Sequence, residues 1–150
     1  IGKGQTYAEN KKRSDDLKLG NVKFMPEVTE KDAGELLAGG DIFLGFLNKS
    51  FSSECSVPNK VFQGLAMGKA VITAETAITK AVFTHKENIY LCKAADANAL
   101  RDAIMELKND VNLRKKIAAN GYKLFKEKFT PKTIGNDLKL ICEELINKSK

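Results

Sequence analysis

Short apolar runs alternate with helical stretches along this chain, and that alternation limits the fold more than any other feature. The run Asp41–Phe46 is mostly apolar, as in a central strand buried on both faces of a sheet. Asn21–Met25, Ala70–Thr73 and Asn88–Leu91 read as further short strands, and a helical pattern separates each from the next. This order is typical of α/β proteins. We therefore predict a doubly wound, Rossmann-like parallel sheet flanked by helices, with a helical C-terminal segment.

Capping residues indicate where the first helices begin. Thr6 and Glu9 have the spacing of a capping box and predict a helix that Gly20 ends. Thr29 and Asp32 predict a second helix start. The chain opens with Ile1, as if at the last residue of a strand, so we expect that an earlier strand and a further domain precede it.

The last helix is expected to begin at Pro131, after the N-cap residue Thr130. Its apolar residues fall on one face with helical spacing, and we expect this face to pack in the core. The residues of this face are Ile134, Leu138, Ile141 and Leu145.

The composition is that of a soluble globular protein, and 150 residues suit one domain spanning residues 1–150. Cys55, Cys92 and Cys142 are too scattered for a zinc site, and their odd number favours a reducing cytoplasm over a secreted fold. No apolar run has the roughly 18 residues of a membrane span. The composition therefore predicts a cytoplasmic protein with no metal.

The positive charge is concentrated at the C-terminal end. Residues 101–150 carry 12 lysines and arginines against 7 aspartates and glutamates, a balance of +5 out of a net +6. Such a segment either forms a solvated helix face or attracts an anionic membrane at its inner surface. Nucleic acid is disfavoured, since aromatic residues make up 7% and no recognition motif is present.

Three segments are candidates for a ligand site, because ligands of open parallel sheets bind beyond the carboxyl ends of the strands. They are Gly2–Thr6, Met25–Thr29 and Leu47–Lys60. The third runs into a helix that we expect to start at Pro58, and a helix amino end favours an anion such as a diphosphate. Lys60 adds a full positive charge there.

The stretch Val57–Ile72 reads VPNKVFQGLAMGKAVI and closely resembles the donor-site signature of the family-four retaining glycosyltransferases, vPnKlfEymAaGkPVI. Ile1–Gly4 is similar to the iGkGp turn of that family, and Asn21–Phe24 to its nVkflG strand. Residues 87–100 and 113–129 are similar to its later segments. The resemblance covers nearly the whole chain in the right order.

The resemblance implies a GT-B fold, in which two Rossmann-like domains enclose the active cleft, and this chain is similar to the C-terminal domain. We therefore expect its acceptor domain and first strand to lie outside the chain. Such enzymes transfer a sugar from a nucleotide diphosphate, here a UDP- or GDP-sugar, to a glycan or lipid-linked acceptor with retention, usually without a metal or other cofactor. The expected donor-binding residues are Gly2, Gly4, Met25, Pro26, Val28, Ser56, Val57, Asn59, Lys60 and Gln63.

Two positions depart from the family pattern. The family usually has two glutamates eight residues apart, and here Cys55 and Gln63 occupy those positions. Gln63 still offers a carbonyl oxygen to a ribose hydroxyl, although a neutral hydrogen bond is worth about 0.5–1.5 kcal/mol against about 1.5–3 for a charged one. Glu54 precedes Cys55 by one residue, and we expect it to act as the catalytic carboxylate beside the sugar.

A second interpretation stays open, that of a non-catalytic Rossmann-like module that binds a nucleotide. A dinucleotide fold usually shows G-x-G-x-x-G after its first strand. Here Gly2 and Gly4 are followed by Tyr7 at the third glycine position, which weakens this alternative. The sequence does not decide between uridine and guanosine donors, or identify the acceptor.

Overall fold

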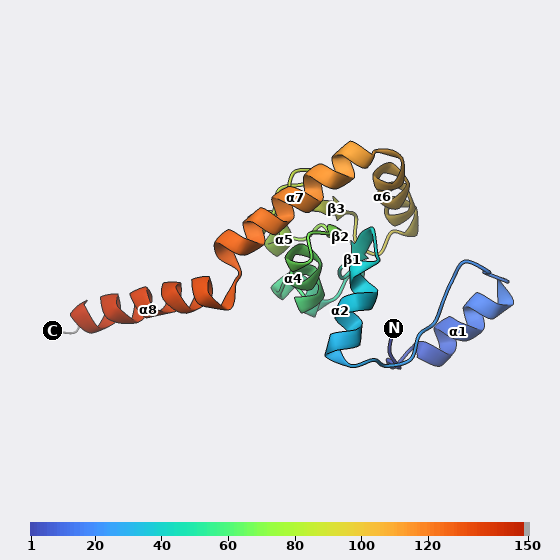
Figure 1. Ribbon diagram of the computed structural model, residues 1–150, viewed down its shortest axis with the longest axis horizontal. Helices are drawn as coiled ribbons and strands as arrows, with labels where there is room; N and C mark the ends of the chain where they lie inside the picture. The colour runs from blue at the N-terminus through green and yellow to red at the C-terminus, as the bar shows by residue number, and fades with distance from the viewer. Residues whose placement is uncertain (149–150) are drawn as a thin grey trace. The chain divides into compact units, whose positions relative to one another are not determined.

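The computed structural model describes residues 1–148, apart from the side chains of Glu30 and Lys31. Contacts divide the chain into two compact units, Ile1–Gly39 and Gly40–Lys150 (Figure 1). The first unit holds two helices, and the second holds a parallel sheet with helices. That residues 1–150 form a single nucleotide-sugar-binding domain stays a prediction.

The first unit contains α1 (Tyr7–Asp16) and α2 (Glu30–Ala38). The predicted start of α2 is confirmed, because the side chain of Thr29 accepts a hydrogen bond from the backbone N–H of Asp32. The rings of Tyr7 and Phe24 meet edge to face, with centroids 5.6 Å apart.

Three predictions for the first unit are wrong. Thr6 makes no capping bond to the backbone of α1, and its hydroxyl instead accepts a hydrogen bond from the Asn10 amide at 3.0 Å. The helix ends at Asp16 rather than near Gly20, since Lys18 adopts a left-handed backbone with φ of 50°. The described part of residues 1–39 also contains no strand at Asn21–Met25, because a strand needs a hydrogen-bonded neighbour.

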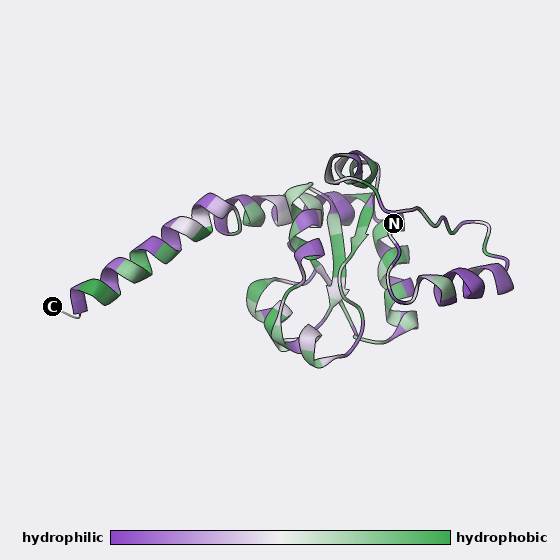
Figure 2. Cartoon of the chain, turned by 90° about the horizontal axis from the view of Figure 1, so that it is seen from below, coloured by the Kyte–Doolittle hydropathy of each residue, from purple (hydrophilic) through white to green (hydrophobic). Residues whose placement is uncertain are grey.

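The second unit is built on β1 (Ile42–Leu44), β2 (Ala70–Ala74) and β3 (Tyr90–Cys92). All pairings are parallel and the order is β1-β2-β3, with Phe43 beside Val71 and Thr73 beside Leu91. This confirms the predicted parallel α/β class. Figure 2 shows the strands as the hydrophobic centre of the unit.

The helices of this unit are α3 (Phe51–Cys55), α4 (Asn59–Ala66), α5 (Ala77–Val82), α6 (Ala97–Asn109), α7 (Val111–Lys128) and α8 (Pro131–Lys148). Alternate residues of β2 contribute to two core clusters. Ala70 and Ile72 pack with Leu107 of α6 and Ile117 of α7, whereas Val71 packs with residues of α4 such as Leu65. Both faces of the sheet are therefore covered, as in Rossmann-like folds.

The prediction that Asp41–Phe46 forms a central strand buried on both faces is wrong. β1 has one sheet neighbour in the described chain and lies at the edge of the sheet. Ile42 and Phe43 are half-buried and Leu44 is exposed. The strand that is buried on both faces is β2, where all five residues are buried.

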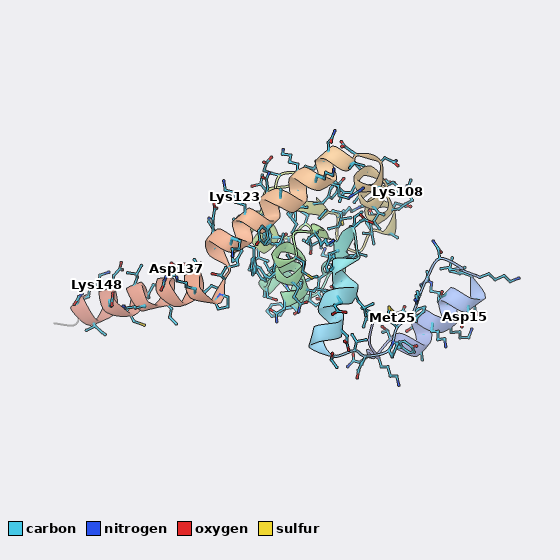
Figure 3. The ribbon with its side chains drawn as sticks, viewed as in Figure 1. Asp15, Met25, Lys108, Lys123, Asp137 and Lys148 are labelled. Carbon is cyan, nitrogen blue, oxygen red and sulfur yellow. The ribbon has the colours of Figure 1, made fainter. Side chains whose placement is uncertain are left out.

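The expected core packing of the last helix is also wrong. No residue of α8 is buried, and Ile134, Leu138, Ile141 and Leu145 are 53–60% exposed. Hydrophobic and hydrophilic segments alternate along α8 in Figure 2, and its side chains stand out along its length, with Asp137 and Lys148 labelled in Figure 3. Helical spacing identifies an apolar face but does not supply a partner for it. None of the described helices is both long and apolar enough to span a membrane.

Candidate functional site

Hydrogen bonds to β2 fix the position of the residues that directly follow β1. The backbone N–H of Gly45 donates to the carbonyl of Ile72 at 2.8 Å, and the N–H of Ala74 donates to the carbonyl of Phe46 at 2.8 Å. The hydroxyl of Thr73 donates to that same carbonyl at 3.1 Å. A side chain at position 45 has no room, since a Cβ would lie 2.5 Å from the Thr73 hydroxyl oxygen. Glycine here lets the end of β1 lie tightly against β2.

The segment between β1 and α4 has local order of its own. It contains α3, which starts with a capping box between Ser50 and Ser53. The Ser53 hydroxyl also donates to the carbonyl of Asn48 at 3.2 Å, and the Ser56 hydroxyl donates to the carbonyl of Ser52 at 3.0 Å. These bonds fix the backbone on both sides of Glu54, whose carboxylate is exposed.

The amino end of α4 follows directly. Pro58 is its N-cap residue, with an extended backbone and no side chain able to bond the first turn. The N–H of Val61 donates to the carbonyl of Pro58 at 2.9 Å, whereas the N–H groups of Asn59 and Lys60 make no hydrogen bond among the described residues. Two unpaired N–H groups and the positive end of the helix dipole favour an anion at this point.

Lys60 and Gln63 lie on α4 as the sequence predicted, and both are exposed. The ammonium of Lys60 lies 4.9 Å from the centroid of the Phe46 ring. Gln63 instead borders an open groove of about 320 Å³ together with Asn59, Phe62, Ala66 and Phe125. Ser56 and Val57 lead into the helix, so the predicted residues from Glu54 to Gln63 lie along one continuous stretch.

A larger cavity of about 490 Å³ lies beside this segment. It is lined by Lys49, Glu54, Glu75, Lys93 and Ala94. Lys49 lies in the loop after β1, Glu75 directly follows β2, and Lys93 directly follows β3. The cavity is thus at the carboxyl ends of the strands, where α/β proteins bind their ligands.

Lys49 lies within the candidate segment Leu47–Lys60 but was not singled out as a site residue, and Glu75 and Lys93 lie outside all three candidate segments. Their positions after predicted strands could have identified them, because ligands of parallel sheets bind beyond the carboxyl ends of the strands. Lys93 forms an ion pair with Asp96 at 3.2 Å, and Glu75 forms one with Lys80 at 3.0 Å. Asp96 is the N-cap of α6, and hydrogen bonds from the Ala99 N–H and the Lys93 ammonium lower the pKa of its carboxyl below the usual value.

The remaining predicted residues belong to the first unit. The N–H of Gly2 donates to the carbonyl of Met25 at 2.9 Å, which brings two of the predicted segments together. Gly2 has φ of 104°, a conformation that favours glycine. The carbonyl of Gly4 accepts a hydrogen bond from the N–H of Tyr7, and Pro26 and Val28 lie in the stretch without regular secondary structure before α2.

A second polar cluster surrounds the beginning of β3. The Tyr90 hydroxyl and the Lys86 ammonium each lie 2.5 Å from a carboxylate oxygen of Glu106 on α6. These two contacts lower the pKa of Glu106, while burial and the bond to Glu106 raise the pKa of Tyr90. His85 accepts the N–H of Leu91 at its Nδ1 at 3.0 Å, and burial, followed by the charge of Lys86, lowers its pKa. The cluster links β3 to α6 by hydrogen bonds and lies at the end of β3 opposite to Lys93, away from the 490 Å³ cavity.

Among residues 1–148, no three His, Cys, Asp or Glu side chains are grouped so as to hold a metal ion. Metal-free and cofactor-free transfer stays a prediction.

Comparison with known proteins places this geometry in context. The chain matches the family described as glycosyl transferase-like over residues 3–139. It is 28% identical over 135 residues to the lipopolysaccharide core biosynthesis glycosyltransferase LpsD of Rhizobium meliloti. That match covers 89% of this chain and 37% of LpsD, so the chain spans well under half the length of this relative.

Solved structures share the fold. HepE from Anabaena, in complex with UDP and glucose, has a TM-score of 0.76 at 20% identity, covering 93% of this chain and 37% of HepE. The C-terminal domain of LpcC, a group 1 glycosyltransferase from Francisella tularensis, has a TM-score of 0.65 at 20% identity, covering 86% of this chain and 66% of that one. The Rossmann-like architecture of a GT-B domain is thereby confirmed. With a family match across most of its length, the chain belongs to the glycosyl transferase-like family.

Proposed function

We propose that this chain binds the nucleotide-sugar donor of a retaining, hexosyltransferase-type glycosyltransferase. Membership of the family supports the reaction class. The solved relative HepE holds UDP-glucose in one structure and UDP with glucose in another, which supports a nucleoside diphosphate as the common ligand. A lipid-linked or glycan acceptor is consistent with the name of LpsD.

The amino end of α4 is the observation that carries this proposal. The unbonded N–H groups of Asn59 and Lys60 lie at the end of a polar segment that follows β1. A diphosphate there accepts both N–H groups and gains the charge of Lys60. The side chain of Gln63, one turn further along α4, then accepts a hydrogen bond from a ribose hydroxyl. Met25, Pro26 and Val28 are assigned to the base, and Gly2 and Gly4 to the phosphates.

The proposed catalytic roles depend on where charge develops during sugar transfer. When the acceptor hydroxyl attacks, its oxygen forms a bond to the anomeric carbon as the bond from that carbon to the diphosphate breaks. Negative charge builds on the leaving phosphate, whose oxygen takes up the proton of the acceptor hydroxyl. Fixed N–H groups and a nearby cation stabilise that charge more than the charge of the bound donor. Glu54, exposed beside the cavity, is assigned to the sugar, where its carboxylate accepts hydroxyl hydrogen bonds and stabilises positive charge on the ring.

Transfer also requires an acceptor, and groups on both reactants must converge. Because the chain spans 37% of LpsD, we assign the acceptor to a second domain. This 150-residue chain is therefore expected to bind a nucleoside diphosphate weakly and to transfer no sugar.

Calorimetric titration of the chain with UDP, GDP, ADP and NAD tests the proposal. Binding of UDP or GDP, with NAD much weaker, is the expected result. Preferential NAD binding would instead favour a dinucleotide module, and binding of none of the four would remove the donor-site assignment. A non-catalytic module is distinguished by an absence of transfer when the second domain is supplied.

We also assign a cytoplasmic location with a peripheral contact to anionic lipid at the inner face of the membrane. Lys115, Lys126 and Lys128 of α7 are exposed and form no ion pair among the described residues. Side chains stand out along α7 in Figure 3, where Lys123 is labelled. Screening acts over about 8 Å at physiological salt, so such a contact is weak. Cosedimentation with phosphatidylserine vesicles should fall as salt rises, and salt-resistant binding would contradict an electrostatic contact.

A further inference from the structure

The outer edge of β3 is closed by one histidine side chain. Among the described strands, β3 pairs only with β2. On its other side, the N–H of Leu91 donates to Nδ1 of His85 at 3.0 Å, and His85 lies beside Ile89 as a parallel bridge. His85 therefore takes the place that a neighbouring strand would have at this edge of the sheet.

The bond between His85 and Leu91 lies close along the chain to the wall of the 490 Å³ cavity. Directly after Leu91, the carbonyl of Cys92 accepts the N–H of Glu75 at 2.7 Å. The next residue, Lys93, lines the cavity, as does Glu75. Since β3 has only three residues and Leu91 is the middle one, the loss of its outer bond affects the end of the strand that supports this wall.

The charge of the His85 ring depends on groups from several elements. The ring of Tyr90 on β3 meets it edge to face, with centroids 4.8 Å apart. Lys86 opposes a positive charge on the ring, whereas Glu106 of α6 and Glu75 after β2 favour one. Burial, followed by the charge of Lys86, outweighs both carboxylates and lowers the pKa of His85. The ring is therefore neutral at pH 7 and able to accept a backbone N–H.

We infer that protonation of His85 opens the outer edge of β3 and loosens the wall of the 490 Å³ cavity, so that donor affinity falls as pH falls. In the imidazolium both ring nitrogens carry a proton, and neither accepts the N–H of Leu91. The charged ring then turns from this N–H toward the carboxylate of Glu106, and the end of β3 loses one of its fixed contacts. The effect on the donor rests on the proposed function, whereas the change in the wall does not.

Calorimetry with UDP-glucose between pH 7.5 and 5.0 tests the effect on the donor, because the diphosphate of this ligand does not titrate in that range. The affinity of the wild type should fall by roughly two- to fivefold, within the worth of one neutral hydrogen bond. His85→Gln supplies an acceptor for Leu91 that does not titrate, so its affinity should fall less. Lys86→Gln removes the charge that opposes protonation and should move the midpoint to higher pH. Lys139→Gln, an exposed lysine of α8, is the matched control and should follow the wild type.

Amide NMR of the free chain tests the wall of the cavity without a ligand. In the wild type, the signals of Leu91, Lys93 and Ala94 should shift with one common midpoint as pH falls. These shifts should be absent from His85→Gln and should move to higher pH in Lys86→Gln. A thermal melt at each pH shows that each variant is folded over the range.

Equal pH profiles of UDP-glucose affinity in the wild type and His85→Gln would overturn the inference, as would a shift of Leu91 with Lys93 and Ala94 unmoved. If His85→Gln does not fold, an unchanged midpoint in Lys86→Gln overturns it instead. Failure of UDP-glucose to bind at pH 7.5 is a different result, because it removes the proposed function. The amide shifts of Lys93 and Ala94 then still decide whether His85 controls the cavity wall.

Discussion

The ammonium group of Lys60 lies 4.9 Å from the centre of the Phe46 ring, and this contact joins the first turn of α4 to a residue that follows β1 by two positions. The carbonyl of Phe46 is held by Ala74 and Thr73 of β2, so this ring has a fixed support. A cation on the face of an aromatic ring gains about 0.5–1 kcal/mol at an exposed site. The contact therefore positions the Lys60 charge beside the unbonded N–H groups of α4.

Replacing Lys60 by alanine should weaken nucleoside diphosphate binding by about 1–3 kcal/mol, as expected for a lost charge-assisted hydrogen bond. Phe46→Leu keeps the Lys60 charge and removes only the aromatic ring that positions it, so the loss of UDP affinity should be smaller. Calorimetry with UDP measures both. Lys139→Ala, which removes an exposed helical lysine of α8, is the matched control and should bind UDP like the wild type. Equal affinity of Lys60→Ala and the wild type would contradict the assignment.

Gln63 should contribute less than Lys60, because it offers a neutral acceptor. We expect Gln63→Ala to cost about 0.5–1.5 kcal/mol of UDP affinity, and Gln63→Glu to improve binding by supplying a charged acceptor to the ribose. Comparison with 2′,3′-dideoxy-UDP checks the mechanism, since the effect of either substitution should vanish without the ribose hydroxyls. A persisting effect would place Gln63 elsewhere on the ligand.

Two glycines in helices should respond oppositely to alanine. A Cβ at Gly121 of α7 would lie 2.8 Å from the Asn88 carbonyl oxygen and 2.7 Å from Leu65, so Gly121→Ala should destabilise the fold by about 1–3 kcal/mol. A Cβ at Gly135 of α8 meets nothing within 4 Å, so Gly135→Ala should stabilise by about 0.4–1 kcal/mol. Urea unfolding of both variants measures the difference. A stable Gly121→Ala variant would show that α7 packs differently.

Stability should depend on pH through His85, the one histidine of the chain. Burial lowers the pKa of His85 below its usual 6.5, and its Nδ1 accepts the N–H of Leu91 only while the ring is neutral. The unfolded chain therefore takes up a proton at higher pH than the folded one, so this stabilisation is complete above 6.5 and is lost as pH falls below it. Melting temperatures between pH 7.5 and 5.5 should fall more for the wild type than for His85→Gln. Parallel pH profiles would refute this role.

The sequence predicted the parts of the fold that local patterning controls. The buried run at β2, the α4 start after Pro58 and the cap at Thr29 all follow from composition and capping chemistry. The edge position of β1 did not follow, because an apolar run looks the same whether or not a second neighbour pairs with it. The exposure of Leu138 and its neighbours on α8 was missed for the same reason.

The candidate site was predictable where a motif marks it and not where distant residues meet. Residues 54–63 form one continuous segment, so the sequence located them together. Lys49, Glu75 and Lys93 come from three different loops, and the parallel pairing of the strands brings them to one cavity. The spacing of these residues along the sequence does not indicate that they lie close together in the fold.

The central claim is that a diphosphate binds at the amino end of α4, and backbone amide NMR during separate titrations with UDP and with GDP tests it most directly. The amide signals of Asn59 and Lys60 should shift most, because their N–H groups are unbonded in the free chain and acquire acceptors. Signals of Gly135 and Leu138 on α8 should stay in place. Saturable shifts at Asn59 and Lys60 are the predicted result, whereas shifts confined to other segments, or none at all, would contradict the account.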